Sequence, residues 1–123
     1  MHFIRTIKSE QELNLNGQKY AVSDIINSVK TDINRIIKEN DLQIEIDAIE
    51  LIGSYMRGEN VSGSDLDVLV QYSGDISDDS IFNILAEEDL SLNGVKIDIN
   101  PINSAEDSIE DFKERNKGFT KRK

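Results

Sequence analysis

The order of apolar and polar positions along the chain predicts one long helix set between groups of strands. From Ile25 to Ile37, apolar residues recur at the three- and four-residue spacing of one helix face. Residues 24–39 are therefore expected to form an amphipathic helix. Ser23 is the expected N-cap of this helix, and Asn40 is expected to end it.

Three apolar stretches rich in β-branched residues predict the long strands of a sheet. They cover residues 44–52, 65–72 and 95–99, and the only proline, Pro101, is expected to close the third. In the second and third stretches, apolar residues alternate with polar ones. This alternation puts the two kinds of side chain on opposite faces of the sheet.

Turns and shorter helices complete the predicted order. The Asn-Gly pairs at 16–17 and 93–94 indicate two hairpins, because this dipeptide suits the tightest hairpin turns. Two further helices are expected, a short one capped by Asp78 or Asp79 and a last one over 105–116. The order hairpin, helix, strand, strand, helix, hairpin, helix predicts an α+β fold. Helices would flank a small mixed or antiparallel sheet.

Length and composition bound the class of protein. The chain has 123 residues, of which 37% are hydrophobic, and this suits a single domain. We expect a core over residues 24–101, followed by the last helix and a basic tail over 117–123. No apolar run approaches the ~20 residues of a membrane-spanning helix, and residues 1–8 lack the apolar centre of a signal peptide. A cytoplasmic protein without membrane contacts is expected.

The residue types that are missing exclude several kinds of chemistry. The chain has no cysteine and one histidine, His2, so disulfides, thiolate metal sites and Ser-His-Asp catalysis are excluded. Its 14 basic and 24 acidic residues give a net charge of −10, which disfavours general binding to nucleic acids. Six basic residues gather within 113–123. We interpret them as a solvated end, with phosphate or partner binding as the alternative.

One segment brings together residues that can carry chemistry. Gly53 and Ser54 close the first long strand, ten residues follow, and Asp65 and Asp67 open the second. A connection of this length is too short for the crossover that joins parallel neighbours, so the two strands are expected to be antiparallel. Antiparallel pairing brings all four residues to one corner of the sheet.

The spacing of the aspartates suggests a cation site. Asp65 and Asp67 are two residues apart on a predicted strand, so their carboxylates project from one face about 7 Å apart along the chain. Mg²⁺ takes oxygen ligands of this kind and keeps positions open for substrate phosphates. Asp98, on the polar face of the third strand, is the candidate third carboxylate. The Gly-Ser turn and Arg57 are suited to hold a triphosphate.

With these residues together, the sequence resembles the DNA polymerase β-type nucleotidyltransferase superfamily, and within it the minimal nucleotidyltransferases. Their pattern is Gly-Ser, ten residues, Asp-x-Asp and a third aspartate on a later strand. The residues that fill it here are Gly53, Ser54, Asp65, Asp67 and Asp98. Arg57 also matches the usual Arg-Gly of these proteins. Tyr55 departs from the pattern, because relatives often carry arginine at this position.

The resemblance implies the palm-like fold of these enzymes and a metal-dependent transfer of a nucleoside monophosphate to a hydroxyl acceptor. ATP is the implied donor. Two Mg²⁺ ions, or Mn²⁺, would be held by Asp65, Asp67 and Asp98. The nucleotide would be bound by Gly53, Ser54 and Arg57.

The acceptor is expected to belong to a partner protein, because only about twenty residues follow the third strand and they offer little to enclose a small molecule. The resemblance makes a HEPN-domain protein the candidate partner and an antitoxin role possible. Two alternatives stay open. One is a non-catalytic module of the same fold that binds a nucleotide or a partner, and the other is a small-molecule nucleotidyltransferase of the antibiotic-modifying type.

Overall fold

The computed structural model describes the chain over residues 11–61 and 63–121, and the side chains as far as residue 115. His2 and the rest of residues 1–8 lie outside the described residues, as do the side chains of the predicted basic tail. No helix in the described part is both long and apolar enough to cross a membrane.

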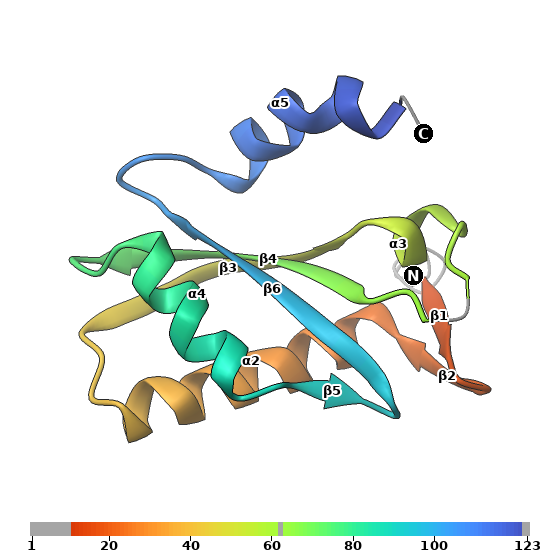
Figure 1. The fold of residues 1–123 in the computed structure, drawn as a ribbon, viewed down its shortest axis with the longest axis horizontal. Coiled ribbons are helices and arrows are strands. Elements are labelled where there is room, and N and C mark those ends of the chain that lie inside the picture. The colour runs from red at the N-terminus through yellow and green to blue at the C-terminus, as the bar shows by residue number, and fades with distance from the viewer. Residues whose placement is uncertain (1–10, 62, 122–123) are drawn as a thin grey trace, which may run out of the picture.

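Within that part, the helices and strands follow the predicted order, from the red N-terminal hairpin to the blue C-terminal helix (Figure 1). Their bounds are β1 Glu12–Leu15, β2 Gln18–Ala21, α2 Val22–Glu39, β3 Ile44–Ile52, α3 Ser54–Arg57, β4 Leu66–Gly74, α4 Asp78–Glu87, β5 Ser91–Leu92, β6 Val95–Asn103 and α5 Ile109–Lys121. The Asn-Gly turns join β1 to β2 and β5 to β6, as predicted.

The four-stranded sheet is mixed and has the order β3-β4-β6-β5. Strand β4 is antiparallel to β3 and parallel to β6, and β5 is antiparallel to β6. The hairpin of β1 and β2 forms a separate two-stranded sheet. The predicted α+β class is confirmed, as is the antiparallel pairing that the short connection between β3 and β4 required.

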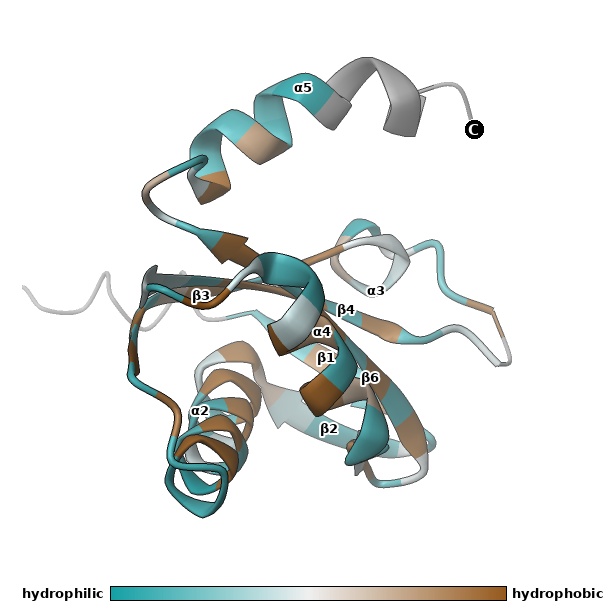
Figure 2. Ribbon diagram, turned by 60° about the vertical axis from the view of Figure 1, so that its left-hand side comes forward, coloured by the Kyte–Doolittle hydropathy of each residue, from teal (hydrophilic) through white to brown (hydrophobic). Residues whose placement is uncertain are grey.

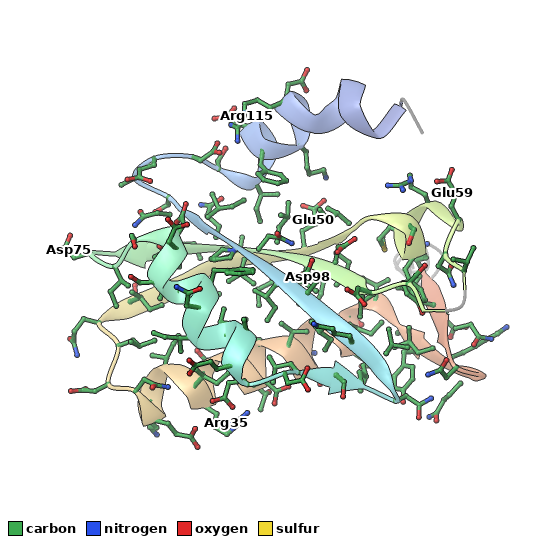
Figure 3. All side chains as sticks on the ribbon, viewed as in Figure 1. Arg35, Glu50, Glu59, Asp75, Asp98 and Arg115 are labelled. Carbon is green, nitrogen blue, oxygen red and sulfur yellow. The ribbon has the colours of Figure 1, made fainter. Side chains whose placement is uncertain are left out.

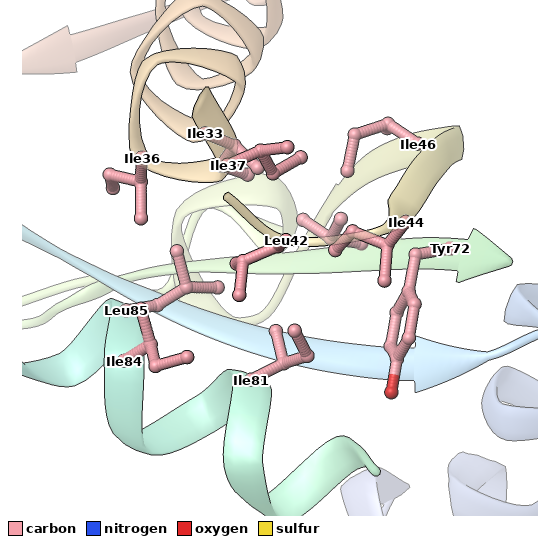
Figure 4. A pocket seen from close by; sticks show the side chains of 11 residues that line it. Ile33, Ile36, Ile37, Leu42, Ile44, Ile46, Tyr72, Ile81, Ile84 and Leu85 are labelled. Carbon is pink, nitrogen blue, oxygen red and sulfur yellow. The ribbon is translucent and has the colours of Figure 1, made fainter. Parts of the chain in front are cut away.

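One face of the sheet is covered by α2 and α4, and this layer holds the main core (Figure 2). Fully buried residues of α2, such as Ile25 and Ile36, pack with the apolar face of β4. Leu13 and Leu15 of β1 belong to the same core, so the core begins before the predicted boundary at residue 24. A small apolar cavity lies in this layer, between α2, α4 and the start of β3 (Figure 4).

The opposite face carries a smaller apolar cluster beneath α5 (Figure 2). Leu69 and Ile102 of the sheet are buried there against Ile109 of α5. An ion pair between Lys113 and Glu50 links α5 to β3 beside this cluster. Helix α5 therefore covers part of one sheet face and leaves the rest of that face to the polar residues described below.

The predicted helix starts were wrong. Helix α2 begins at Val22, before Ser23, and no side chain caps it. The cap of α4 is Ser77, whose hydroxyl accepts a hydrogen bond from the Ser80 N–H. Neither predicted aspartate has this role, because a residue placed inside the first turn cannot act as its cap.

The last helix also differs from the prediction, since it spans Ile109–Lys121 instead of 105–116. Asn103 accepts hydrogen bonds from the backbone N–H groups of Glu106 and Asp107 and folds residues 104–106 into a turn. The helix then starts after Ser108, whose hydroxyl accepts a hydrogen bond from the Asp111 N–H. The chain predicted as a tail from residue 117 continues this helix as far as Lys121.

Strand β6 runs through Pro101 to Asn103, so the expected end of the strand at the proline was also wrong. Among the described residues, β5 pairs only with Val95 and Lys96, and the outer side of β6 has no strand partner beyond them. A proline is tolerated on such an edge, because its missing N–H breaks no ladder hydrogen bond there.

Candidate active site

The pairing of three strands brings the predicted site residues into one row. Asp67 of β4 lies opposite Ile52, the last residue of β3, and Gly53 follows at once. On its other side, Asp67 lies directly beside Asp98 of β6. The corner of the sheet that the sequence predicted is therefore formed by the end of β3, the start of β4 and the middle of β6.

Alternation along β4 and β6 decides which face this row occupies. Leu66 and Val68 on β4, and Ile97 and Ile99 on β6, are buried in the main core. Asp67 and Asp98, which alternate with these residues, are directed to the opposite face and are partly exposed. The apolar cavity between α2 and α4 lies on the core side and is not part of this site.

The pKa of the Asp67 carboxyl group is raised from its ordinary value to about 6. Its burial is the largest cause, because it disfavours the charged form. The negative charge of Asp98 and a hydrogen bond between the two carboxyl groups raise the pKa further, Asp65 adds to this, and Arg57 opposes it. Three aspartates therefore place negative charge close together at this corner of the sheet.

Gly53 is required by the position of the Asp67 carboxylate. Its φ of +87° lies in a region that side chains rarely adopt. A Cβ at this position would stand 2.3 Å from Asp67 Oδ2, which is shorter than any permitted contact. The first residue of the Gly-Ser pair therefore lets the backbone pass directly against a site carboxylate.

Ser54 begins α3, and Arg57 ends it. The Arg57 N–H donates to the Gly53 carbonyl at 3.2 Å, which closes this single helical turn. The Arg57 side chain is partly exposed, and its Nε donates to Glu59 Oε1 at 2.8 Å. Since the charge of Arg57 lowers the pKa of Asp67, the guanidinium lies within electrostatic range of the carboxylate pair.

Tyr55, the departure from the family pattern, is buried in the main core. Its side chain is directed into the protein and not toward the face that carries Asp67. The substitution therefore changes packing beneath α3, while Ser54 and Arg57 remain on the partly exposed side of the turn.

Asp65 differs from its prediction, because β4 begins one residue later, at Leu66. Asp65 is exposed and acts on Asp67 through its charge. Among the described residues, no group of three or more histidine, cysteine, aspartate or glutamate side chains is arranged so that it could hold a metal ion. Joint ligation by Asp65, Asp67 and Asp98 stays a prediction.

Two neighbours of Asp98 extend the description of this region. Asn100 shares its face, and its side-chain nitrogen donates to the Asp98 carbonyl at 3.4 Å. A cavity between α4 and β6 also includes Asp98 in its wall, together with Phe82 and Lys96. Figure 3 shows Asp98 on β6, with Glu50 nearer to α5 and Glu59 in the loop that follows α3.

Glu59 is not among the predicted site residues, and the structure places its carboxylate in contact with one of them, Arg57. The only available signal was an acidic residue two positions after Arg57, with a glycine between them. Gly58 adopts the left-handed conformation, and this reverses the chain so that the two side chains meet.

Comparison with known families agrees with this geometry. A family model described as a nucleotidyltransferase domain matches residues 30–120. The matched range includes the whole row of site residues and the helix that lies over their face of the sheet. No curated protein and no solved structure matches the chain.

Substitution of Gly53 by alanine tests the close approach to Asp67. We expect Gly53→Ala to destabilise the fold by about 1 kcal/mol or more beyond Gly58→Ala. Both glycines have a positive φ, but a Cβ at Gly58 would meet nothing within 4 Å. Urea unfolding of the two variants measures the difference. Equal losses would show that the Asp67 carboxylate does not pack against Gly53.

The raised pKa of Asp67 predicts that its carboxylate lowers the stability of the fold by an amount that depends on pH. An acid that binds its proton more tightly in the folded state adds stability below about pH 4 and loses that contribution as the pH rises through about 6. Asp67→Asn should therefore stabilise the free chain at pH 7.5 by about 1 kcal/mol, since the partial exposure of Asp67 reduces the full linkage value.

Unfolding curves of this variant and the unaltered chain at several pH values between 4 and 7.5 measure the effect. The gain should shrink steadily toward pH 4. A gain that is independent of pH, or a loss at pH 7.5, would contradict the assignment.

Proposed function

Because the chain belongs to the nucleotidyltransferase domain family, we propose that it transfers a nucleoside monophosphate from a nucleoside triphosphate to a hydroxyl group of a partner protein. The observation that carries this proposal is the pairing of Asp67 with Asp98 beside the Gly53-Ser54 turn. ATP is the proposed donor and a HEPN-domain protein the proposed partner, as the resemblance to minimal nucleotidyltransferases implies. An antitoxin role would follow from that pairing.

Divalent cations fit the donor set of the site. Asp67 and Asp98 offer carboxylate oxygens side by side. Burial and the neighbouring negative charges raise the pKa of Asp67, and a cation would offset those charges. Asp65, Asp67 and Asp98 would hold Mg²⁺ or Mn²⁺. When bound, such ions neutralise phosphate charge and make the acceptor hydroxyl easier to deprotonate.

The turn after β3 is proposed to hold the phosphates. Gly53 presents backbone without a side chain, and Ser54 adds a hydroxyl donor at the start of α3. Arg57 adds a guanidinium, which suits phosphate oxygens because its N–H groups form a planar fork. These three residues and the carboxylate pair provide the two requirements of the reaction, which are positioning and charge neutralisation.

The proposed reaction is one displacement at the α-phosphorus of the triphosphate. The acceptor oxygen forms a bond to this phosphorus while the bond from phosphorus to the bridging oxygen breaks. Pyrophosphate leaves with the electron pair of that bond. Asp98 is proposed to accept the proton of the acceptor hydroxyl, so its carboxyl group must be ionised when the acceptor binds.

A protein acceptor is supported by the exposure of the site and by charge. Asp67 and Asp98 are partly exposed on a sheet face, and Asp65 before them is exposed. The net charge of −10 attracts a basic partner surface and speeds its approach. An acceptor residue carried on such a surface can reach the row of carboxylates without a deep pocket.

Label transfer with two forms of labelled ATP tests the reaction. With Mg²⁺ and the candidate partner, label in the α-phosphate should appear on the partner, and label in the γ-phosphate should leave as pyrophosphate. Asp67→Asn should abolish transfer, because it removes one carboxylate of the pair. Asp32→Asn, which alters an aspartate on α2, is the matched control and should retain it.

The outcomes separate the parts of the proposal. Transfer of the γ-label, or transfer that survives Asp67→Asn, would contradict the nucleotidyltransferase site. Label from the α-phosphate on small molecules only would contradict the protein acceptor and leave the reaction type intact.

A further inference from the structure

Glu59 is joined to the proposed phosphate-binding turn by two contacts. Its backbone N–H donates to the Ser54 carbonyl at 2.8 Å, so the start of the loop is fixed to the start of α3. Its carboxylate accepts from Arg57 Nε, also at 2.8 Å. The bond from the Glu59 N–H fixes the backbone of Glu59 beside Ser54. The bond to the Glu59 carboxylate then holds the guanidinium of Arg57 at this place.

The contact through Nε has a geometric consequence. A guanidinium carries five N–H donors in one plane, and the Nε edge is only one side of that fork. Among the described residues, the two terminal nitrogens of Arg57 have no hydrogen-bond partner. Glu59 therefore occupies one edge of the guanidinium and leaves the terminal edge available for a phosphate.

We propose that Glu59 is a positioning residue, which holds the guanidinium of Arg57 in the orientation that receives the triphosphate. This inference rests on the proposed function, because it assumes that Arg57 binds phosphate.

The alternative role for Glu59 is competition, in which its carboxylate occupies the arginine until a phosphate displaces it. The strength of the ion pair argues against this role. The two side chains are 37% and 61% exposed, and pairs of this kind contribute only about 0.2–1 kcal/mol. A triphosphate carries several negative charges, so it can bind the guanidinium of Arg57 without displacing Glu59. The larger effect of Glu59 is therefore to orient the long, flexible side chain of Arg57, and its competition with phosphate is the smaller one.

Binding of ATP in the presence of Mg²⁺, measured by titration calorimetry on the full chain, tests the proposal. Glu59→Ala should raise the Kd by about three-fold, which lies within the range for an exposed pair. Glu59→Gln should restore most of the affinity, because glutamine keeps an acceptor oxygen for Nε. Arg57→Ala should weaken binding more, and adding Glu59→Ala to it should cause no further loss.

Glu39→Ala is the matched control. Glu39 accepts from Arg35 at 3.1 Å on α2, and this pair is also exposed, with 45% and 56% of the side chains accessible. Its removal should leave the Kd unchanged. The melting temperature of the free chain should differ little between the Glu39 and Glu59 variants, which separates positioning from general stability.

The measurements distinguish failure of the role of Glu59 from failure of the proposed function. Unchanged or tighter binding in Glu59→Ala, or additive losses in the double variant, would overturn the positioning role alone. If Arg57→Ala binds as well as the unaltered chain, the assignment of Arg57 to phosphate fails, and Glu59 fails with it. If ATP with Mg²⁺ does not bind the unaltered chain, the proposed function itself is wrong.

Discussion

The register between β4 and β6 is the constraint on which the candidate site depends. Parallel pairing places Asp67 directly beside Asp98, and alternation along both strands turns the two carboxylates to the same face. A shift of one residue in either strand would move its aspartate into the core face, against α2 and α4. The buried apolar residues that alternate with the aspartates therefore fix the register and, through it, the site.

Two like charges in a partly buried position cost stability, and the surrounding structure offsets that cost. The core beneath the sheet buries Leu66, Val68, Ile97 and Ile99 on the same strands as the carboxylates. Each such residue contributes about 1.5–3 kcal/mol, so the pair is held together although it repels itself. Strain of this kind is typical of functional sites, where a bound cation or substrate is expected to relieve it.

Sequence patterns predicted the parts of this arrangement that depend on nearby residues. The ten-residue connection after Ser54 implied antiparallel strands, and alternation placed Asp98 on the polar face; both predictions are confirmed. The parallel pairing of β4 with β6 depends on how α4 packs across the sheet, which no local pattern reveals. The ion pair between Arg57 and Glu59 depends on the left-handed Gly58, so it could not be predicted from spacing alone.

The predicted helix boundaries were wrong for a related reason. Several serines and aspartates near each start were able to cap a helix, and tertiary contacts selected among them. Asn103 is buried at the end of β6 and holds the following turn, so α5 begins four residues later than its sequence suggested. As a result, α5 packs over the part of this sheet face around Leu69 and Ile102, and Asp67 and Asp98 are not members of the apolar cluster beneath it.

Asp67 and Asp98 form one electrostatically coupled pair, which we propose binds a cation and a nucleotide. Titration of the Asp67 carboxyl group by NMR measures this coupling directly. We expect a pKa of about 6 in the free chain, a lower value in Asp98→Asn, and a fall in the unaltered chain when Mg²⁺ and ATP are added. A pKa near 3.8 in the free chain, or one that neither Asp98→Asn nor Mg²⁺ with ATP changes, would contradict this expectation.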